Sequence, residues 1–413
     1  MERILIAPWG LPVGWKEVSY LIGEKEERAT SSIKPLVNEL KPNKVILVVV
    51  DTAIQEKFGD YQDLCKKVEE FYRKYCEEAL LLPLAPEVVV APGVGTFFPQ
   101  GEKIRFEGEM TDFYYFVSFE LAKRLISVEG ELDLILDLTH GVNFAPTLLY
   151  RGLHEILGVL AYTKKVLFRV FNAEPFREGV EALRIHPVES REIQPRLSPH
   201  LLGEKDGRAY LLKPGSDGRI EKEETDELNA FLSSIVNGLP LAFFTFYPKE
   251  GLEKRLKKAC SLWREAIECG RSRVVRRRRF TEDFMRCIRL WVAAKSFGKE
   301  RKEEVSLEEL EDVAERFRTE GMKYALIGRT LKDLKVEEDK RKKLGEGWVP
   351  LSEVMERKAG PFSPQNFLAH AGLEYNLTEV CVSDGTIKLR YPKSQRKNVR
   401  EACRWGLFNP GRK

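Results

Sequence analysis

Short apolar runs alternate with amphipathic segments through the first half of the chain. The runs are rich in β-branched residues and continuously apolar, as expected of strands buried on both faces, and they lie at 3–7, 45–50, 88–90 and 132–138. Helical spacing of apolar residues is found between and after them, over 61–82, 111–128 and 145–162. Two closing strands are predicted at 167–171 and 182–186. This alternation predicts a Rossmann-like α/β domain with a parallel-rich sheet over residues 1–190.

The pattern changes after residue 190. Pro and Gly residues punctuate 191–225, which predicts a linker or a small ordered insertion. From 226 to 413 the spacing is mainly helical, and helices are predicted over 226–237, 250–268, 274–297, 306–329, 350–358 and 394–405. The Asp384-Gly385 pair lies between alternating runs and predicts a β-hairpin. The second domain, 226–413, is therefore expected to be helical with one small hairpin.

Charge is distributed unevenly along the chain. The net charge is only +4, from 68 Lys and Arg against 64 Asp and Glu. Residues 1–250, however, carry 30 basic and 39 acidic side chains, whereas 251–413 carry 38 and 25. An acidic N-terminal part and a basic C-terminal part indicate two domains with different partners. Six arginines within 271–279 form either a solvated helix face or a surface for a polyanion such as RNA, with Arg271, Arg273, Arg276 and Arg277 as the candidate RNA contacts.

Composition and motifs argue against several classes of protein. Seven scattered cysteines without zinc spacing, no N-terminal signal peptide and no apolar run near the ~20 residues of a membrane helix predict a cytoplasmic protein with reduced thiols. Gly93-Val94-Gly95 does not extend to a dinucleotide fingerprint, because Phe98 occupies the third glycine position. No phosphate-loop motif and no convincing metal-binding constellation is present. Six Gln and ten Asn beside many Lys, Arg and Glu suggest a thermophilic source.

Candidate ligand contacts follow the predicted strands, because ligands of open parallel sheets bind beyond the carboxyl ends of the strands. In the loop 137–143, backbone N–H groups and the Thr139 hydroxyl suit a phosphate, while Asn143 would cap the next helix or contact a base. Trp9 and Trp15 would stack on bases or cover the core edge. Ser31 and Ser32 would cap a helix or contact the ligand. The candidate ligand-binding residues are Trp9, Gly10, Trp15, Ser31, Ser32, Asp51, Thr52, Gly95, Thr139, His140, Gly141, Val142 and Asn143.

The second half contains one segment that could support catalysis. Asn366 and His370 are four residues apart and would share a helical face. Such a polar pair could hold a scissile phosphate or activate a hydroxyl, although a lone histidine also commonly bonds a nearby carbonyl. Gln365, which lies five residues before His370, is the third candidate catalytic residue.

Two segments together carry a family resemblance. The run Asp137-Leu138-Thr139-His140-Gly141-Val142-Asn143 resembles the signature loop of CARF domains, and 366–372 resembles the active-site segment of HEPN domains. Trp9-Gly10, 15–18 and 92–97 also fit, so the whole chain resembles the CARF–HEPN accessory ribonucleases of type III CRISPR systems. The resemblance implies an antiviral endoribonuclease that cleaves single-stranded RNA without metal or cofactor. It also implies a homodimer or a higher oligomer. The implied allosteric activator is a cyclic oligoadenylate, namely cyclic tetra-adenylate, which would bind across two CARF domains.

The chain departs from this family at Gln365. The family motif is Arg-x4-His, and the arginine position here holds an uncharged glutamine. A developing phosphorane would lose a charge-assisted contact. Three explanations are open: a naturally attenuated enzyme, an engineered variant, or a charge supplied in space by Arg357 or by an arginine of 271–279. The alternative function is a ligand-gated RNA-binding protein with an attenuated or dead nuclease site. A sensor that degrades its own ligand through Thr139 and His140, and a DNA-binding regulator, are further alternatives.

Overall fold

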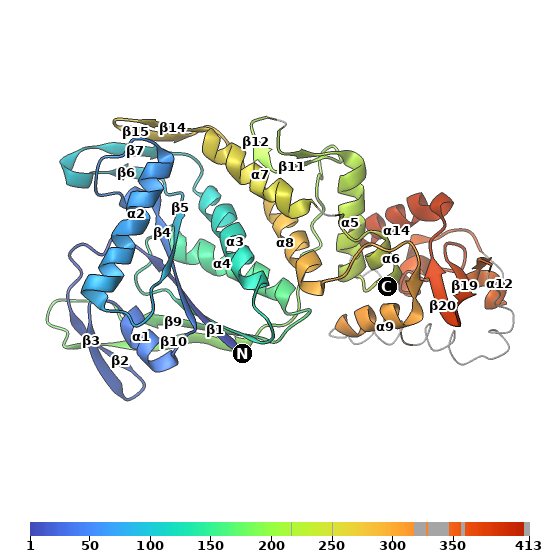
Figure 1. Cartoon of the computed structure of the whole chain (residues 1–413), viewed down its shortest axis with the longest axis horizontal. Coiled ribbons are helices and arrows are strands. Elements are labelled where there is room, and N and C mark those ends of the chain that lie inside the picture. The colour runs from blue at the N-terminus through green and yellow to red at the C-terminus, as the bar shows by residue number, and fades with distance from the viewer. Residues whose placement is uncertain (216, 250, 318–327, 329–346, 357–359, 409–413) are drawn as a thin grey trace. The chain divides into compact units, whose positions relative to one another are not determined.

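The computed structural model describes residues 1–413 apart from 216, 250, 318–327, 329–346, 357–359 and 409–413 (Figure 1). The chain divides into two compact units. Unit 1 comprises Met1–Gln194, Leu211–Gly218 and Lys257–Ile288, and unit 2 comprises Pro195–Tyr210, Arg219–Leu256 and Arg289–Lys413. Among the described helices, none combines the length and apolar character that crossing a membrane requires.

An eight-stranded mixed sheet forms the centre of unit 1. Its order is β3-β2-β10-β9-β8-β1-β4-β5. The neighbours β9–β8–β1–β4–β5 are all parallel, whereas β9 pairs antiparallel with β10 and β2 with β3. The mostly parallel sheet predicted from the apolar runs is confirmed. The strands are β1 (Glu2–Trp9), β2 (Val18–Ile22), β3 (Lys25–Ala29), β4 (Lys44–Val50), β5 (Glu87–Ala91), β8 (Leu132–Asp137), β9 (Val166–Ala173) and β10 (Ala182–Glu192).

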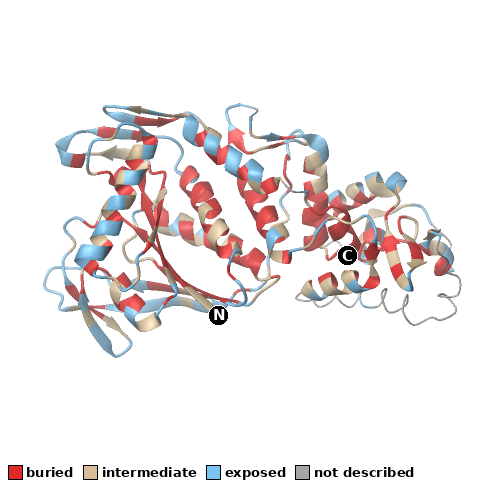
Figure 2. Ribbon diagram, in the orientation of Figure 1, coloured by how far each residue is buried: buried red, intermediate tan, exposed pale blue. Residues whose placement is uncertain are grey.

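Four helices accompany this sheet: α1 (Ile33–Leu40), α2 (Tyr61–Tyr75), α3 (Thr111–Ile126) and α4 (Phe144–Leu160). Asp60 begins α2 by accepting a hydrogen bond from the Asp63 N–H at 2.8 Å. Helices α3 and α4 pack against each other and are buried over most of their length (Figure 2). Gly152 permits their close approach, because a Cβ there would lie 2.5 Å from the Ser118 hydroxyl.

The helix predicted over 274–297 is wrong in its first part, because these residues contribute a strand to a second, four-stranded sheet. Its order is β14-β15-β7-β6, with β14 (Ile267–Gly270), β15 (Arg273–Arg276), β7 (Ile104–Glu107) and β6 (Gly95–Phe97). The helix α8 (Glu282–Phe297) begins only after β15 and the short β16 (Arg279–Phe280). Val274 and Val275 are buried and β-branched, and β15 pairs in parallel with β7. The arginine-rich segment therefore belongs to unit 1 with the front of the chain.

A buried ion pair fastens this segment to the large sheet. Arg276 and Asp51 have fully buried side chains, and the guanidinium Nη2 contacts the Asp51 carboxylate. Arg276 Nη1 also donates to the Gly93 carbonyl at 2.7 Å. The carboxylate accepts two further hydrogen bonds, from the Gly93 N–H at 2.8 Å and the Tyr61 hydroxyl at 3.0 Å. The loops that follow β4 and β5 are thus tied to a residue more than 180 positions away.

Asp112 in α3 makes a second attachment. Its carboxylate accepts hydrogen bonds from the Phe280 N–H at 2.9 Å and the Trp263 indole N–H at 3.4 Å. Burial raises the pKa of this carboxyl group to about 6. The Trp263 and Phe280 rings stack with centroids 5.2 Å apart. The arginine-rich segment is flanked in sequence by α7 (Leu252–Glu265) and α8. Each of these two helices has residues in both units.

Unit 2 combines helices with a small antiparallel sheet. The sheet order is β17-β20-β19-β18, and the hairpin predicted at Asp384-Gly385 is confirmed, with Ser383 opposite Thr386. The helix predicted over 306–329 is described over Leu307–Arg316, and most of its remainder lies outside the described residues. The elements are α5 (Lys222–Val236), α6 (Pro240–Thr245), α9 (Leu307–Arg316), α12 (Leu351–Val354), α13 (Pro364–Ala369), α14 (Arg396–Phe408), β17 (Val305–Ser306), β18 (Val349–Pro350), β19 (Glu379–Ser383) and β20 (Thr386–Arg390).

The segment 191–225 contributes to both units. Three short strands lie in it: β11 (Ala209–Tyr210), β12 (Leu212–Lys213) and β13 (Arg219–Ile220). β11 pairs with β13, and β12 pairs with β16 of the arginine-rich segment. The segment is therefore an ordered part of the fold with its own strand pairing.

Removing the Arg276 guanidinium should destabilise unit 1. Arg276→Met leaves Asp51 charged and buried without its cation, and we expect a loss of about 3–5 kcal/mol in the free energy of unfolding. Urea denaturation followed by circular dichroism measures this loss. Arg277→Met is the matched control, because Arg277 pairs with Glu268 at the surface, and its denaturation midpoint should barely change. Equal midpoints for the two variants would contradict the anchoring role.

Candidate functional site

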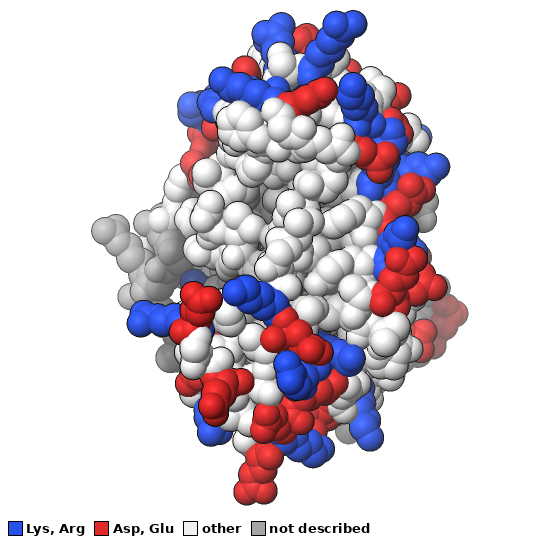
Figure 3. All heavy atoms as spheres, turned by 90° about the vertical axis from the view of Figure 1, so that its left-hand side faces the viewer, with Lys and Arg blue, Asp and Glu red and all other residues white. Residues whose placement is uncertain are grey.

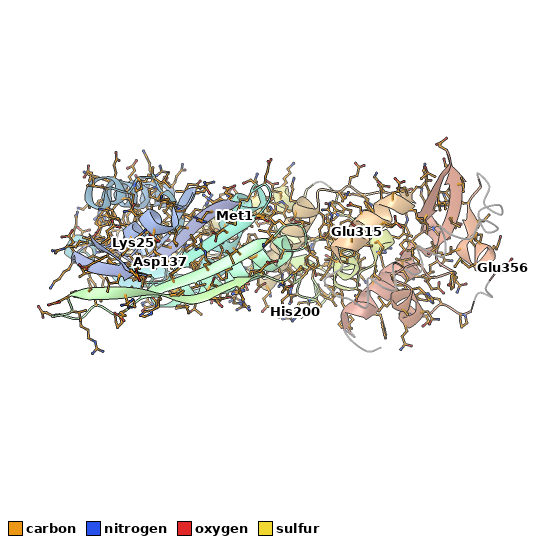
Figure 4. The ribbon with its side chains drawn as sticks, turned by 90° about the horizontal axis from the view of Figure 1, so that it is seen from below. Met1, Lys25, Asp137, His200, Glu315 and Glu356 are labelled. Atoms are coloured by element: carbon orange, nitrogen blue, oxygen red, sulfur yellow. The ribbon has the colours of Figure 1, made fainter. Side chains whose placement is uncertain are left out.

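The loops after β1 and β8 meet at the carboxyl edge of the large sheet. From β1 the sheet extends through β4 and β5 on one side and through β8 and β9 on the other. This is the switch point at which open α/β sheets form their ligand crevice. Asp137, the last residue of β8, is labelled in Figure 4, as is Met1 at the opposite end of the neighbouring β1. Figure 3 shows that the corresponding face of the molecule is hollowed and largely free of Lys, Arg, Asp and Glu, with charges around its rim.

Aromatic rings gather at this switch point. The Trp15 ring stacks on the His140 ring with centroids 4.0 Å apart and an interplanar angle of 24°. Trp9 lies edge-on to Trp15 at 5.2 Å, and Tyr75 from α2 lies edge-on to both indoles at 6.2 and 6.4 Å. The Trp9 indole N–H is buried and has no acceptor among the described residues. The cluster thus offers stacked planar surfaces and one unsatisfied donor.

Burial disfavours the charged form of His140. Desolvation lowers the pKa of its imidazole, although the nearby Asp137 carboxylate acts in the opposite direction. The Ser32 N–H donates to Nε2 at 3.3 Å, and the Tyr20 hydroxyl lies 3.4 Å from the same nitrogen. These contacts assign Nε2 as the acceptor of a neutral ring. His140 therefore supplies a flat surface to the site and no positive charge.

Asp137 holds the signature loop in place. Its Oδ2 accepts from the Ser32 hydroxyl at 2.7 Å, and its Oδ1 accepts from the Thr139 N–H and hydroxyl at 3.0 and 2.6 Å. The Thr139 oxygen in turn accepts from the Ala173 N–H at 3.0 Å. The Thr139 hydroxyl is thus engaged within the protein, and its contact with a phosphate stays a prediction.

Two glycines let the loops after β1 and β8 approach each other. Gly10 donates its N–H to the His140 carbonyl at 2.8 Å, and a Cβ on Gly10 would lie 2.5 Å from the Val142 side chain. A Cβ on Gly141 would lie 2.2 Å from Pro146. Asn143 precedes α4 with φ +43° and makes no capping hydrogen bond through its exposed side chain. Val142 and Asn143 are thus the exposed residues of the loop, whereas Gly141 is half-buried.

Of the predicted ligand contacts after β4 and β5, Asp51 and Thr52 are buried, and Gly95 stays a prediction. Asp51 was expected to face the ligand, but its side chain is fully buried and bound by Arg276, Tyr61 and Gly93. Thr52 is buried against Gly93, where a Cβ would lie 2.8 Å from the Thr52 methyl carbon. Gly95 begins β6 of the four-stranded sheet. Ser31 is also buried, and its hydroxyl accepts from the Ile33 N–H at 3.3 Å.

Sequence reasoning missed Tyr20 and Tyr75. Tyr20 lies on β2, within a stretch for which no strand was predicted, and Tyr75 ends α2 and bonds the Thr30 hydroxyl at 3.0 Å. Neither tyrosine belongs to a recognisable motif. Tyr20 lies on a hairpin whose available sequence signal was Gly23, since Ile22 pairs with Lys25 across a two-residue turn that begins with this glycine.

The candidate nuclease segment lies on α13 in unit 2. Ser363 begins this helix, and its hydroxyl accepts from the Asn366 N–H. Gln365 and Asn366 are exposed, Phe367 is buried, and the half-buried His370 ends the helix. The His370 N–H donates to the Asn366 carbonyl at 2.9 Å, so these residues are one helical turn apart, as predicted. Arg357, one candidate for the missing cation, lies outside the described residues.

The four candidate RNA-binding arginines belong to unit 1, whereas His370 belongs to unit 2. Arg276 is buried in its ion pair with Asp51, which corrects its expected role as an RNA contact. Arg277 forms an exposed pair with Glu268, while Arg271 and Arg273 make no ion pair within the described part of the chain. Across the described residues, no three His, Cys, Asp or Glu side chains are grouped so that they could hold a metal ion.

Comparison with known proteins matches both halves of the chain. Residues 4–175 match the model of the CARF domain of CRISPR system endoribonuclease Csx1, and residues 320–394 match the model of its HEPN domain. The chain is 32% identical to the CRISPR system endoribonuclease Csx1 of Methanocaldococcus jannaschii over 431 aligned positions, which cover 96% of this chain and 91% of that protein. The chain therefore belongs to the Csx1 family of CARF–HEPN CRISPR-associated endoribonucleases.

Proposed function

We propose that this endoribonuclease cleaves single-stranded RNA without a metal ion, in the cytoplasm, when cyclic tetra-adenylate binds across the CARF domains of a homodimer. The observation that carries the proposal is the neutral aromatic cluster at the switch point of one unit, together with the Asn366–His370 pair in the other. The first can bind nucleobases, and the second can act on a phosphodiester.

The switch-point cluster suits an adenine-containing anion. Trp15 and His140 provide planar surfaces on which bases stack, and the unsatisfied Trp9 N–H could donate to an acceptor of the ligand. The face is nearly uncharged, so phosphates would be bound by backbone N–H groups of the loop before α4.

The same face suits a symmetric dimer. Val13, Val142 and Phe176, which follow β1, β8 and β9, are exposed apolar side chains. A two-fold cyclic ligand can contact the same loops on two copies of the chain, and pairing of the copies would cover these side chains.

The nuclease chemistry would use the RNA itself as the nucleophile. The 2′-hydroxyl attacks the adjacent phosphorus, the P–O5′ bond breaks, and the products carry a 2′,3′-cyclic phosphate and a 5′-hydroxyl. His370 would bind the phosphate or transfer a proton, and the exposed Asn366 amide would donate to a phosphate oxygen. Gln365 can donate a hydrogen bond but no charge, so it favours attenuated cleavage, and a dead site that only binds RNA is the second candidate.

Cyclic tetra-adenylate should switch on RNA cleavage in EDTA. We expect labelled single-stranded RNA to be cut by the wild-type protein only when this ligand is added. His370→Ala should lower the rate by about 10²–10⁴-fold, because it removes the group that transfers the proton. Denaturing gels and end-group analysis measure both effects. Ligand-independent cleavage, a requirement for a divalent cation, or full activity of His370→Ala would contradict the proposal.

Trp15→Ala should weaken ligand binding while leaving the nuclease segment intact. Loss of one stacking surface is expected to raise the Kd for cyclic tetra-adenylate about tenfold or more, as measured by calorimetry. Trp348→Ala is the matched control, because Trp348 packs on Arg390 in unit 2. If both variants bind the ligand like the wild type, the aromatic cluster is not the ligand site.

Gln365→Arg should raise the ligand-activated cleavage rate. The added guanidinium restores a charge-assisted contact to the developing phosphorane, and a gain between several-fold and about 10³-fold is expected. Single-turnover kinetics measure the gain, and Gln395→Arg controls for the added charge in the same unit. Activity that appears only in Gln365→Arg would favour the RNA-binding alternative, whereas equal rates in wild type and Gln365→Arg would exclude it.

A further inference from the structure

A chain reversal directly after α13 brings Tyr375 back to His370. Ala371 and Gly372 both adopt left-handed backbone conformations, with φ of +52° and +82°. The Gly372 N–H donates to the Phe367 carbonyl and the Leu373 N–H to the His370 carbonyl, each at 2.8 Å. As a result, the Tyr375 and His370 rings lie with centroids 5.2 Å apart at an angle of 55°. A residue five positions downstream therefore packs on the candidate catalytic imidazole.

The core of unit 2 fixes this reversal. The buried Tyr391 hydroxyl donates to the Gly372 carbonyl at 2.7 Å. A Cβ at Gly372 would lie 2.9 Å from the same hydroxyl, so this position requires glycine for space as well as for its backbone angle. The Phe367 ring is fully buried 6.2 Å from the Tyr391 ring. The backbone of His370 is thus held between two core contacts.

Glu374 fixes the position of Tyr375 from the other side. The buried Glu374 carboxylate accepts from the Asn376 N–H at 3.0 Å and from its side-chain amide at 2.9 Å. The Glu374 carbonyl also accepts from the Leu377 and Thr378 N–H groups. Burial raises the pKa of Glu374, although these donors act against the shift. Tyr375 therefore extends from a turn that is braced on both sides.

We propose that Tyr375 is a positioning residue of the nuclease site, which packs its ring on the His370 imidazole and holds that imidazole in the orientation for RNA cleavage. The inference rests on the proposed catalytic role of His370. Contact with the Tyr375 ring restricts rotation of the half-buried His370 imidazole about its side-chain bonds. Orientation matters, because a misplacement of about 1 Å can cost about 10²-fold in rate.

Substitutions at Tyr375 test the proposal in the full-length protein, in both the wild-type and Gln365→Arg backgrounds. Tyr375→Phe keeps the ring, and its kcat should stay within about threefold of the parent, whereas Tyr375→Ala should lower kcat about tenfold or more with little change in KM. Tyr375→Leu keeps most of the volume without a flat ring, and it should also lower kcat. Tyr210→Ala is the matched control in unit 2, and thermal unfolding verifies that each variant is folded.

The outcomes separate this inference from the function on which it rests. Full cleavage by His370→Ala would overturn both. Loss of cleavage in His370→Ala together with parental kcat in folded Tyr375→Ala would overturn only the role of Tyr375. A rise in KM at unchanged kcat would identify Tyr375 as an RNA-contacting residue and would also overturn the positioning role. In the His370→Ala background, Tyr375→Ala should have no further effect, because both residues act through one imidazole.

Discussion

The architecture of unit 1 depends on a single buried ion pair between residues that are distant in sequence. Asp51 directly follows β4 and Arg276 ends β15, and their contact brings the loops after β4 and β5 together with a segment from the second half of the chain. A carboxylate that accepts three hydrogen bonds is well compensated for its burial, but it cannot also bind a ligand. The loops after β1 and β8 therefore form the accessible part of the crevice. Aromatic rings, not charged side chains, line the crevice there.

This ion pair also shows where prediction from sequence ends. The parallel strands were predictable because runs such as 45–50 are apolar on both faces, which only a covered sheet can accommodate. The run at 271–279 predicts exposure instead of burial, since six arginines in nine residues normally indicate a solvent-exposed segment. Arg276 is buried because Asp51 supplies a countercharge and Val274 and Val275 complete a strand beside β7. Such a partner cannot be inferred from local pattern.

The charge distribution has to be reinterpreted for the same reason. Along the sequence, an acidic front precedes a basic back. Once 257–288 is counted with unit 1, that unit carries 34 basic and 35 acidic side chains, and unit 2 carries 34 and 29. Arg277, Arg278 and Arg279 are further paired with Glu268, Asp217 and Glu109. In this run Arg276 anchors the fold, while the other arginines mainly balance the acidity of unit 1, and affinity for RNA cannot be assigned from the run.

The candidate sites differ in how far their local sequence defines them. At the CARF loop, Asp137, Thr139, His140 and Gly141 are neighbours in sequence, so a motif could locate the site even though Tyr20 and Tyr75 were missed. At the HEPN segment the motif includes Asn366 and His370, but the contact between the His370 and Tyr375 rings depends on a chain reversal. Tyr391, which directly follows β20, donates to the Gly372 carbonyl in that reversal. The uncharged Gln365 is exposed on this same well-braced segment. The segment has a well-defined backbone geometry but no cation at the motif position, so we expect a cation restored at that one position to have the greatest effect on cleavage.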